Sequence, residues 1–198
     1  MGKVVKFPIQ TPEKFGPERV RKKKAGEVEK NGQLNLFSGA KVVRLHKLSE
    51  FEEALILDDQ GERTSAVKLY LKAIKNGDAL GDAYCNLGII EWQQGNSVKA
   101  VDYFTLALQH DPRHFEAHYN LANLYGELGN FPLAKAHYRI SIELEPTFPN
   151  SHFNLALTFA MNKEFDEAVK CLVQYRDLAA PADHQLADDL IIKLSSAK

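Results

Sequence analysis

The chain has 198 residues, a formal net charge of −1 and a hydrophobic content of 44%. This length suits one domain with a tail better than two large domains. No apolar run approaches the roughly 18 to 20 residues of a membrane-spanning helix, so an integral membrane protein is not expected. The N-terminal segment has no apolar centre and carries Glu13 and Glu18, unlike a secretory signal. We therefore expect a cytoplasmic protein.

Charge is divided unevenly along the chain. Residues 1–47 hold 12 Lys or Arg and four Asp or Glu, whereas residues 48–198 hold 13 and 22, so the two parts carry +8 and −9. The basic part shows no apolar periodicity and cannot bury enough surface to offset the entropy lost on ordering. We predict a basic, largely disordered arm over 1–46 and a folded domain over 47–198.

The arm contains one apolar cluster, in the string Gln33, Leu34, Asn35, Leu36 and Phe37. This string resembles the short Q-L-x-L-F peptide with which bacterial replication and repair proteins dock on the sliding clamp. The resemblance implies that Leu36 and Phe37 enter an apolar pocket of the clamp. The alternative is that both side chains fold back on the domain. The basic cluster over 19–24 can bind nucleic acid by counterion release, or it is simply a solvated tail.

Three segments of the domain align without gaps at a constant offset, beginning at Asp82, Glu116 and Asn150. The same frame finds small and aromatic residues at matching places upstream, which indicates a weaker first copy. The predicted repeats cover about 47–80, 81–114, 115–148 and 149–182.

Each copy contains two stretches with a period of 3.6 residues, which is typical of helices. In the first stretch, Leu87, Leu121 and Leu155 recur at the same position, and each is followed by Gly or Ala. Turn-forming residues separate the two stretches, and Pro112 and Pro146 end the second one in the middle copies. Each copy is therefore predicted to form a helix-turn-helix hairpin.

Small residues at fixed positions, such as Gly88 and Ala100, allow the two helices of a hairpin to approach closely. Aromatic residues such as Phe104 fill the space next to them. These small, aromatic and proline positions resemble the tetratricopeptide repeat (TPR) family. The resemblance implies an all-α fold, a right-handed α-solenoid of about four TPR hairpins. An apolar segment after Pro181 predicts a C-terminal capping helix over about 183–195.

One face of each first helix points away from the apolar stripe and is free for a ligand. An asparagine recurs there in three copies, and an amide offers both a donor and an acceptor to the backbone of an extended peptide. The resemblance implies that these asparagines line the concave surface and contact a bound peptide. The alternative is that they are family-typical polar residues on a solvated face. The predicted peptide-binding residues are Asn86, Asn120, Asn123, Asn154, Tyr119, Phe153, Asp82 and Glu116.

The predicted groove is polar to acidic, so we expect a protein or peptide partner that is neutral to basic. Some relatives hold chaperone C-termini in a carboxylate clamp, which needs Lys and Arg in the groove. Cys85, Glu116 and Asn120 stand at such places here, so no clamp activity is expected. A further hypothesis is that the arm itself occupies the groove, because a tethered segment has a high effective concentration.

No catalytic triad or phosphate-cradling glycine loop is recognisable in the sequence, so we predict no enzyme activity and no cofactor. His110, His114 and His118 recur on every fourth position, but Pro112 interrupts the helix and no further ligand completes a metal site. Instead, we expect His118 to donate a hydrogen bond within the core, as does its counterpart His152 in the next copy.

The predicted function is a non-catalytic protein–protein interaction module, an adaptor or scaffold that binds a peptide segment of a partner in its concave groove. Two alternatives remain open. One is a nucleic-acid-associated adaptor that acts through the arm or the 33–37 string. The other is a homo-oligomeric structural protein that stacks through its first hairpin.

Overall fold

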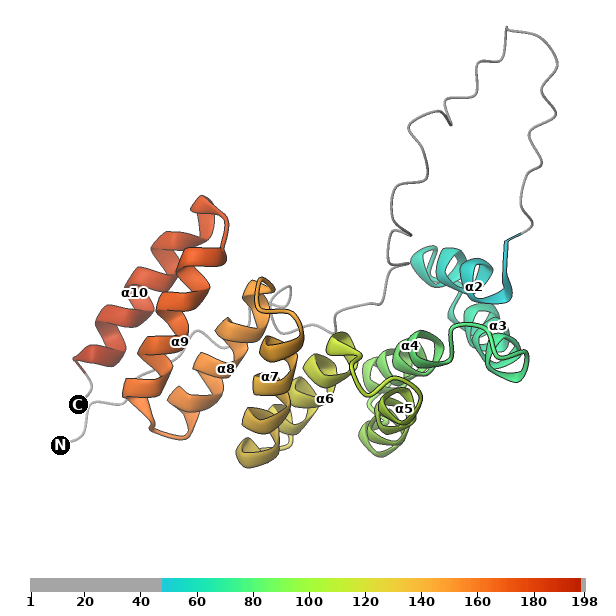
Figure 1. Cartoon of the computed structure of the whole chain (residues 1–198), viewed down its shortest axis with the longest axis horizontal. Helices are drawn as coiled ribbons and strands as arrows, with labels where there is room; N and C mark the ends of the chain where they lie inside the picture. The colour runs from blue at the N-terminus through green and yellow to red at the C-terminus, as the bar shows by residue number, and fades with distance from the viewer. Residues whose placement is uncertain (1–47, 197–198) are drawn as a thin grey trace, which may run out of the picture.

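The computed structural model describes residues 48–196, and all regular secondary structure in that range is helical. The predicted arm and the 33–37 string lie outside the described residues. Helices pair into consecutive antiparallel hairpins (Figure 1), namely α2 (Glu50–Asp59) with α3 (Arg63–Lys75), α4 (Leu80–Gln93) with α5 (Ser97–His110), α6 (Phe115–Glu127) with α7 (Phe131–Leu144), and α8 (Pro149–Met161) with α9 (Phe165–Leu178). The predicted fold class, an all-α solenoid of hairpins, is confirmed.

The solenoid ends in a capping helix. A short 3-10 helix, η1 (Pro181–Asp183), leads into α10 (His184–Ser195), which packs on α9. Ala187, Leu190 and Leu194 of α10 are buried in the last hydrophobic cluster. An open-ended stack needs such a terminal element to cover the apolar face of its last repeat.

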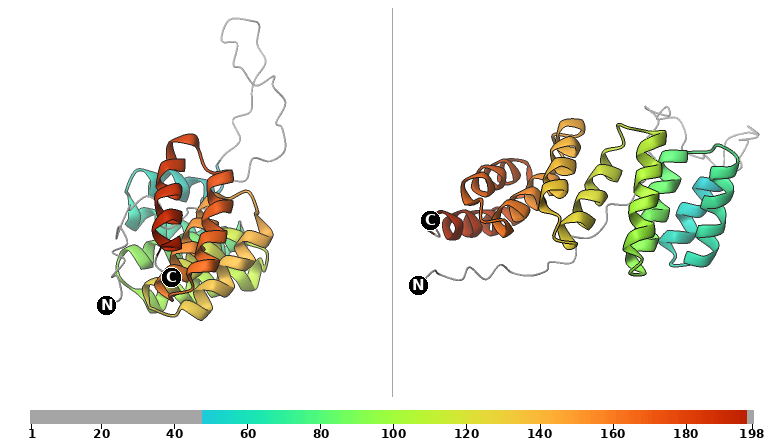
Figure 2. Two further views of the ribbon diagram at one scale, coloured as in Figure 1. Left: turned by 90° about the vertical axis from the view of Figure 1, so that its left-hand side faces the viewer. Right: turned by 90° about the horizontal axis from the view of Figure 1, so that it is seen from below.

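The hairpins follow one another along the long axis of the molecule (Figure 2). The first helices of neighbouring hairpins contact each other directly, α4 with α6 and α6 with α8. Among the described helices, the second helices of neighbouring hairpins contact each other less closely than these first helices do. The first helices α2, α4, α6 and α8 therefore form an inner layer, and the second helices α3, α5, α7 and α9 form an outer layer.

Close packing within a hairpin depends on residues that lack a large side chain. A Cβ atom built on Gly88 would lie 2.7 Å from two ring atoms of Phe104, which is fully buried. Ala100, Ala134 and Ala168 occupy equivalent buried places on α5, α7 and α9. The apolar side chains gather in three successive clusters along the stack, as expected for a solenoid in which each repeat packs on its neighbours.

The turns within the hairpins require a left-handed backbone. Gly61, Gly95 and Gly129 have φ of 82°, 82° and 75° in the first three turns, a conformation that glycine adopts without a steric cost. The fourth turn places Lys163 at φ 62°. A residue with a Cβ atom is strained in this region.

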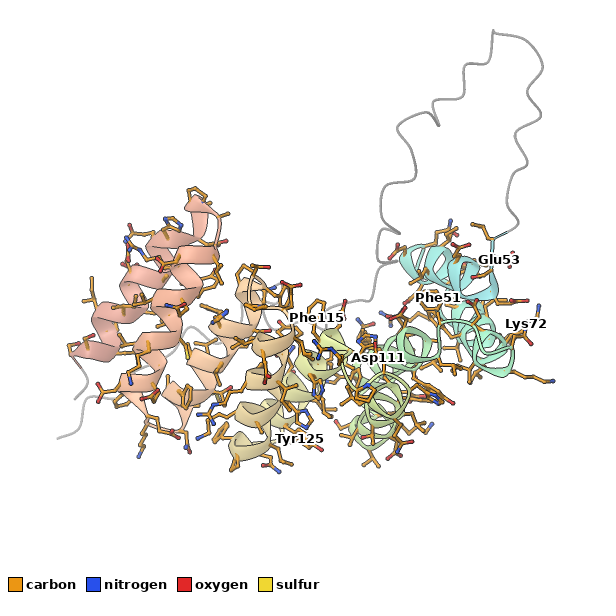
Figure 3. The ribbon with its side chains drawn as sticks, viewed as in Figure 1. Phe51, Glu53, Lys72, Asp111, Phe115 and Tyr125 are labelled. Carbon is orange, nitrogen blue, oxygen red and sulfur yellow. The ribbon has the colours of Figure 1, made fainter. Side chains whose placement is uncertain are left out.

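The junction between the first two hairpins departs from the repeat pattern because Asp78 replaces the proline found in the next two copies. Helix α3 instead ends with Gly77 at φ 74°. The Asp78 carboxylate accepts a hydrogen bond from the backbone nitrogen of Phe51 at 3.2 Å, at the start of α2. Figure 3 shows Phe51 and Glu53 on α2 and Lys72 on α3. Asp78 thus binds the connection between α3 and α4 to the start of α2.

Candidate peptide-binding surface

The four predicted asparagines all lie on inner-layer helices. Asn86 is on α4, Asn120 and Asn123 are on α6, and Asn154 is on α8, with exposed fractions of 1%, 0%, 5% and 1%. The prediction that these side chains face open solvent is wrong for this structure. The periodicity of one helix shows which face is apolar, but it does not show how closely the next inner helix packs against the polar face. Their role in binding a partner stays a prediction.

The amides bridge successive inner helices. Asn154 Nδ2 on α8 donates to Tyr119 Oη at 3.0 Å and to Asn123 Oδ1 at 2.8 Å, both on α6. One repeat earlier, Asn120 Nδ2 on α6 makes a weaker contact of 3.7 Å with Cys85 Sγ on α4. The asparagine of one repeat therefore reaches the residue that precedes the asparagine of the previous repeat. These contacts fix the spacing of the inner layer.

Asn123 is held in one orientation. Its Oδ1 accepts from Asn154 Nδ2 and also from the hydroxyl of Tyr138 on the outer helix α7. Its Nδ2 is buried and has no hydrogen-bond partner within residues 48–196. A buried donor without an acceptor costs about 1 to 3 kcal/mol.

The two predicted aromatic ligands are part of the hydrophobic core. Tyr119 and Phe153 are only 1% and 3% exposed. The ring of Tyr119 makes an edge contact with Phe148 at 5.2 Å, and Phe153 packs against Tyr175 at 4.8 Å. Both rings belong to the buried cluster that holds apolar residues of the third and fourth hairpins, so neither is open to solvent, and their role in binding a peptide stays a prediction.

The two predicted carboxylates share one histidine. His114 lies in the connection between α5 and α6, directly before Phe115. Figure 3 labels Asp111 in this connection and Phe115 at the start of α6. Its Nε2 is 2.9 Å from Asp82 Oδ1 at the start of α4, and its Nδ1 is 3.2 Å from Glu116 Oε2. Glu116 is buried, whereas the Asp82 side chain is 34% exposed and is the most open of the predicted site residues. This cluster ties α4 to α6.

Protonation changes what His114 does. Burial opposes the charged ring, but hydrogen bonds to Asp82 and Glu116 outweigh it and raise the pKa of His114 to about 9. In the neutral ring, Nδ1 accepts from the backbone nitrogen of Ala117 at 3.2 Å and caps α6. In the charged ring, Nδ1 is a donor to Glu116 and the cap is lost. At neutral pH His114 is therefore an imidazolium, with Asp82 and Glu116 as the partners of its two ring nitrogens.

Two further histidines connect α6 and α7. His118 Nδ1 lies 2.9 Å from His137 Nδ1, and His118 Nε2 lies 3.3 Å from the carbonyl oxygen of Pro112. Because a carbonyl only accepts, His118 donates from Nε2, and the expected core hydrogen bond is confirmed. His152 repeats it with Pro146 at 3.0 Å. Burial lowers the pKa of His137 to about 4, and the His118 ring adds to this effect.

Acidic residues are concentrated in the inner layer. The four inner helices contain nine Asp or Glu and no Lys or Arg. The rest of residues 48–198 contains 13 acidic and 13 basic residues. The net charge of −9 carried by residues 48–198 therefore comes entirely from the inner helices. The nine residues are Glu50, Glu52, Glu53, Asp58, Asp59, Asp82, Glu91, Glu116 and Glu127.

The part of the chain that the structure describes has no group of three or more His, Cys, Asp or Glu placed to hold a metal ion. None of its helices has the length and apolar character needed to cross a membrane.

Sequence reasoning considered His114 only as a metal ligand and missed its contacts with Asp82 and Glu116. The available signals were a histidine directly before the first helix of one repeat and an acid, Asp82, at the start of the first helix of the preceding repeat.

Comparison with known families decides the identity of the repeat. One family model described as tetratricopeptide repeat matches residues 81–114 and 115–148, and a second model with the same description matches residues 137–170. The chain is a tetratricopeptide repeat protein. The first two windows correspond to the hairpins α4–α5 and α6–α7 of this TPR protein. No curated protein matches its sequence.

Several solved structures share the fold. The TPR2B domain of yeast Sti1 in its complex with an Hsp70 peptide has 22% identity and a TM-score of 0.56, covering 60% of this chain and 98% of its own. The first TPR of Spaghetti (RPAP3), bound to the HSP90 peptide SRMEEVD, has 20% identity and a TM-score of 0.54, with coverage of 59% and 94%. The MamA protein has 15% identity and a TM-score of 0.59, with coverage of 75% and 89%.

Proposed function

We propose that this TPR protein is a non-catalytic adaptor whose inner layer binds an extended peptide segment of a partner protein. The observation that carries the proposal is the Asn123 amide, which is fixed by Tyr138 and Asn154 and keeps a buried Nδ2 donor without an acceptor among the described residues. A peptide carbonyl is the acceptor that such a donor binds regardless of the peptide's side chains.

The charge of the inner layer supports a neutral to basic ligand. Nine acidic residues without a single Lys or Arg produce a negative potential along α2, α4 and α6, and α8 carries no charged residue. An acidic peptide such as the SRMEEVD ligand of the Spaghetti domain would be repelled by this layer. The structural relatives bind peptides within the same fold, and this support concerns the mode of binding, not the sequence bound.

A display selection with random peptides against the intact chain tests the proposal. We expect the selected peptides to be rich in Lys and Arg and to lose at least fivefold in affinity, measured by calorimetry, with the Asn123→Ala variant. Asn162→Ala removes an exposed turn amide and is the matched control. Circular dichroism must show that Asn123→Ala is folded, and Asp82→Asn provides a second inner-layer variant if it is not. Selection of acidic peptides, or equal affinity for both alanine variants, would contradict the proposal.

The other hypotheses remain predictions. The nucleic-acid and sliding-clamp alternatives depend on residues 1–47, which the structure does not describe. The homo-oligomer alternative stays a prediction that a concentration series in analytical ultracentrifugation can test.

A further inference from the structure

We infer that the inner layer has a ligand within the same chain, namely the basic cluster Arg19, Arg21, Lys22, Lys23 and Lys24 of the N-terminal segment, which competes with a partner peptide. This inference rests on the proposed function, because it assigns a regulator to the same surface. It is carried by three observations on charge, on the buried carboxylate of Glu116 and on the length of chain before α2.

The charges of the two parts are complementary in position as well as in sum. Residues 1–47 carry +8, and the charge excess of residues 48–198, −9, coincides with that of the inner helices. Outer-layer lysines approach some of these acids, since Lys72 Nζ is 3.1 Å from Glu50 and Lys99 Nζ is 3.8 Å from Glu91. Asp82 and Glu116 have no such lysine among their described ion pairs and share only His114.

Glu116 is a buried acid that shares its one described cationic partner. Its residue is 9% exposed, and its Oε2 lies 3.2 Å from Nδ1 of the His114 ring. The same ring lies 2.9 Å from Asp82, so one imidazolium serves both acids. A buried carboxylate with one shared partner is costly. A guanidinium or ammonium group beside Asp82 and Glu116 would offset that cost with charge-assisted hydrogen bonds.

The tether is long enough for this contact. The described chain begins at Leu48, directly before α2, which is the first helix of the inner layer. About 24 residues separate the basic cluster from that point, and a chain of this length reaches at most about 80 Å when fully extended. The distance from α2 to α6 is about two helix spacings of roughly 10 Å each. The cluster can therefore reach Asp82 and Glu116, and tethering raises its effective concentration there, so a weak contact suffices.

Heteronuclear NMR on the intact chain tests the inference. The charge-reversed variant Lys22→Glu, Lys23→Glu, Lys24→Glu is compared with Lys3→Glu, Lys6→Glu, Lys14→Glu, which makes the same charge change elsewhere in the segment. We expect the first variant, and wild type in 0.5 M NaCl, to shift the backbone amide signals around Asp82 and Glu116. The second variant should leave those signals in place. No shift in the first variant, or equal shifts in both variants, would overturn the inference.

The inner layer has its own matched control. The double substitution Asp82→Asn, Glu116→Gln should remove the difference in backbone amide shifts between the two triple-lysine variants. The control double substitution Asp102→Asn, Glu143→Gln on the outer layer should preserve that difference. A difference that grows with protein concentration would assign the contact to a second copy and overturn the intrachain assignment.

Competition separates this inference from the proposed function. A Lys-rich peptide from the display selection should bind the Lys22, Lys23, Lys24 variant at least fivefold more tightly than wild type. Equal affinities would overturn the competition while leaving the proposed function intact. Failure of every peptide to bind either protein would overturn the proposed function itself.

Discussion

The titration of His114 gives a stability change of defined sign and pH range. A pKa raised from an ordinary value of 6.5 to about 9 means that the folded protein holds this proton more tightly than the unfolded chain does. The resulting stabilisation is fully present below pH 6.5 and is lost as the pH rises through about 9. The difference corresponds to about 3 kcal/mol. Deprotonation also restores the cap on the Ala117 nitrogen, but a folded-state pKa of about 9 already includes that gain, so the expected loss stays about 3 kcal/mol.

Urea unfolding at pH 6.5 and pH 9.5 measures this loss. The matched variant is His114→Asn, since asparagine is a good N-cap residue and does not titrate. We expect the free energy of unfolding to fall by about 3 kcal/mol between the two pH values in wild type and to stay nearly constant over that range in the variant. The His114 ring signals should titrate near pH 9 in NMR spectra. Titration of that ring below pH 7, or the same loss in the variant, would show that the carboxylates do not hold this proton.

Three further predictions concern the stack itself. Because the pKa of His137 is lowered to about 4, the folded protein loses about 2 kcal/mol of its free energy of unfolding as the pH falls from 6.5 through about 4. His137→Gln should abolish that loss in acid unfolding curves. Gly88→Ala forces a methyl group against Phe104 and should lower the free energy of unfolding by about 1 to 2 kcal/mol, despite the better helix propensity of alanine; an unchanged midpoint would contradict the tight packing inferred at this site. Lys163→Gly relieves the left-handed turn and should raise the free energy of unfolding by about 1 kcal/mol, with Lys170→Gly, inside α9, as a destabilising comparison.

The fold could be predicted because its determinants are local and repeated. Gly88, Ala100 and Phe104 recur in kind from one copy to the next, and three aligned copies separate packing positions from chance. The first hairpin shows the limit of this reasoning. Asp78 at a proline position looks like a defect in the sequence, yet in the structure its carboxylate binds the Phe51 nitrogen. That contact joins the connection between α3 and α4 to the start of α2, 27 residues earlier, and no local pattern encodes it.

The candidate site could be predicted only in part. The periodicity of α6 and α8 placed Asn123 and Asn154 on the polar side of each helix, but their burial follows from the contact between the two helices, which depends on the superhelical geometry. The role of His114 depends on a distance of 2.9 Å to Asp82 across two hairpins. By contrast, the segregation of acids into the inner helices can be read from the sequence once the hairpins are assigned.

The decisive experiment for an acidic, peptide-binding inner layer compares two peptides of identical length and backbone, one with four lysines and one with four glutamates at the same places. Each is titrated into the Lys22→Glu, Lys23→Glu, Lys24→Glu variant of the intact chain, and binding is mapped by NMR. We expect the lysine peptide to bind and to shift signals of α4, α6 and α8, and the glutamate peptide not to bind. Binding of the glutamate peptide with equal affinity, or shifts confined to α5, α7 and α9, would rule out the inner layer as the binding surface.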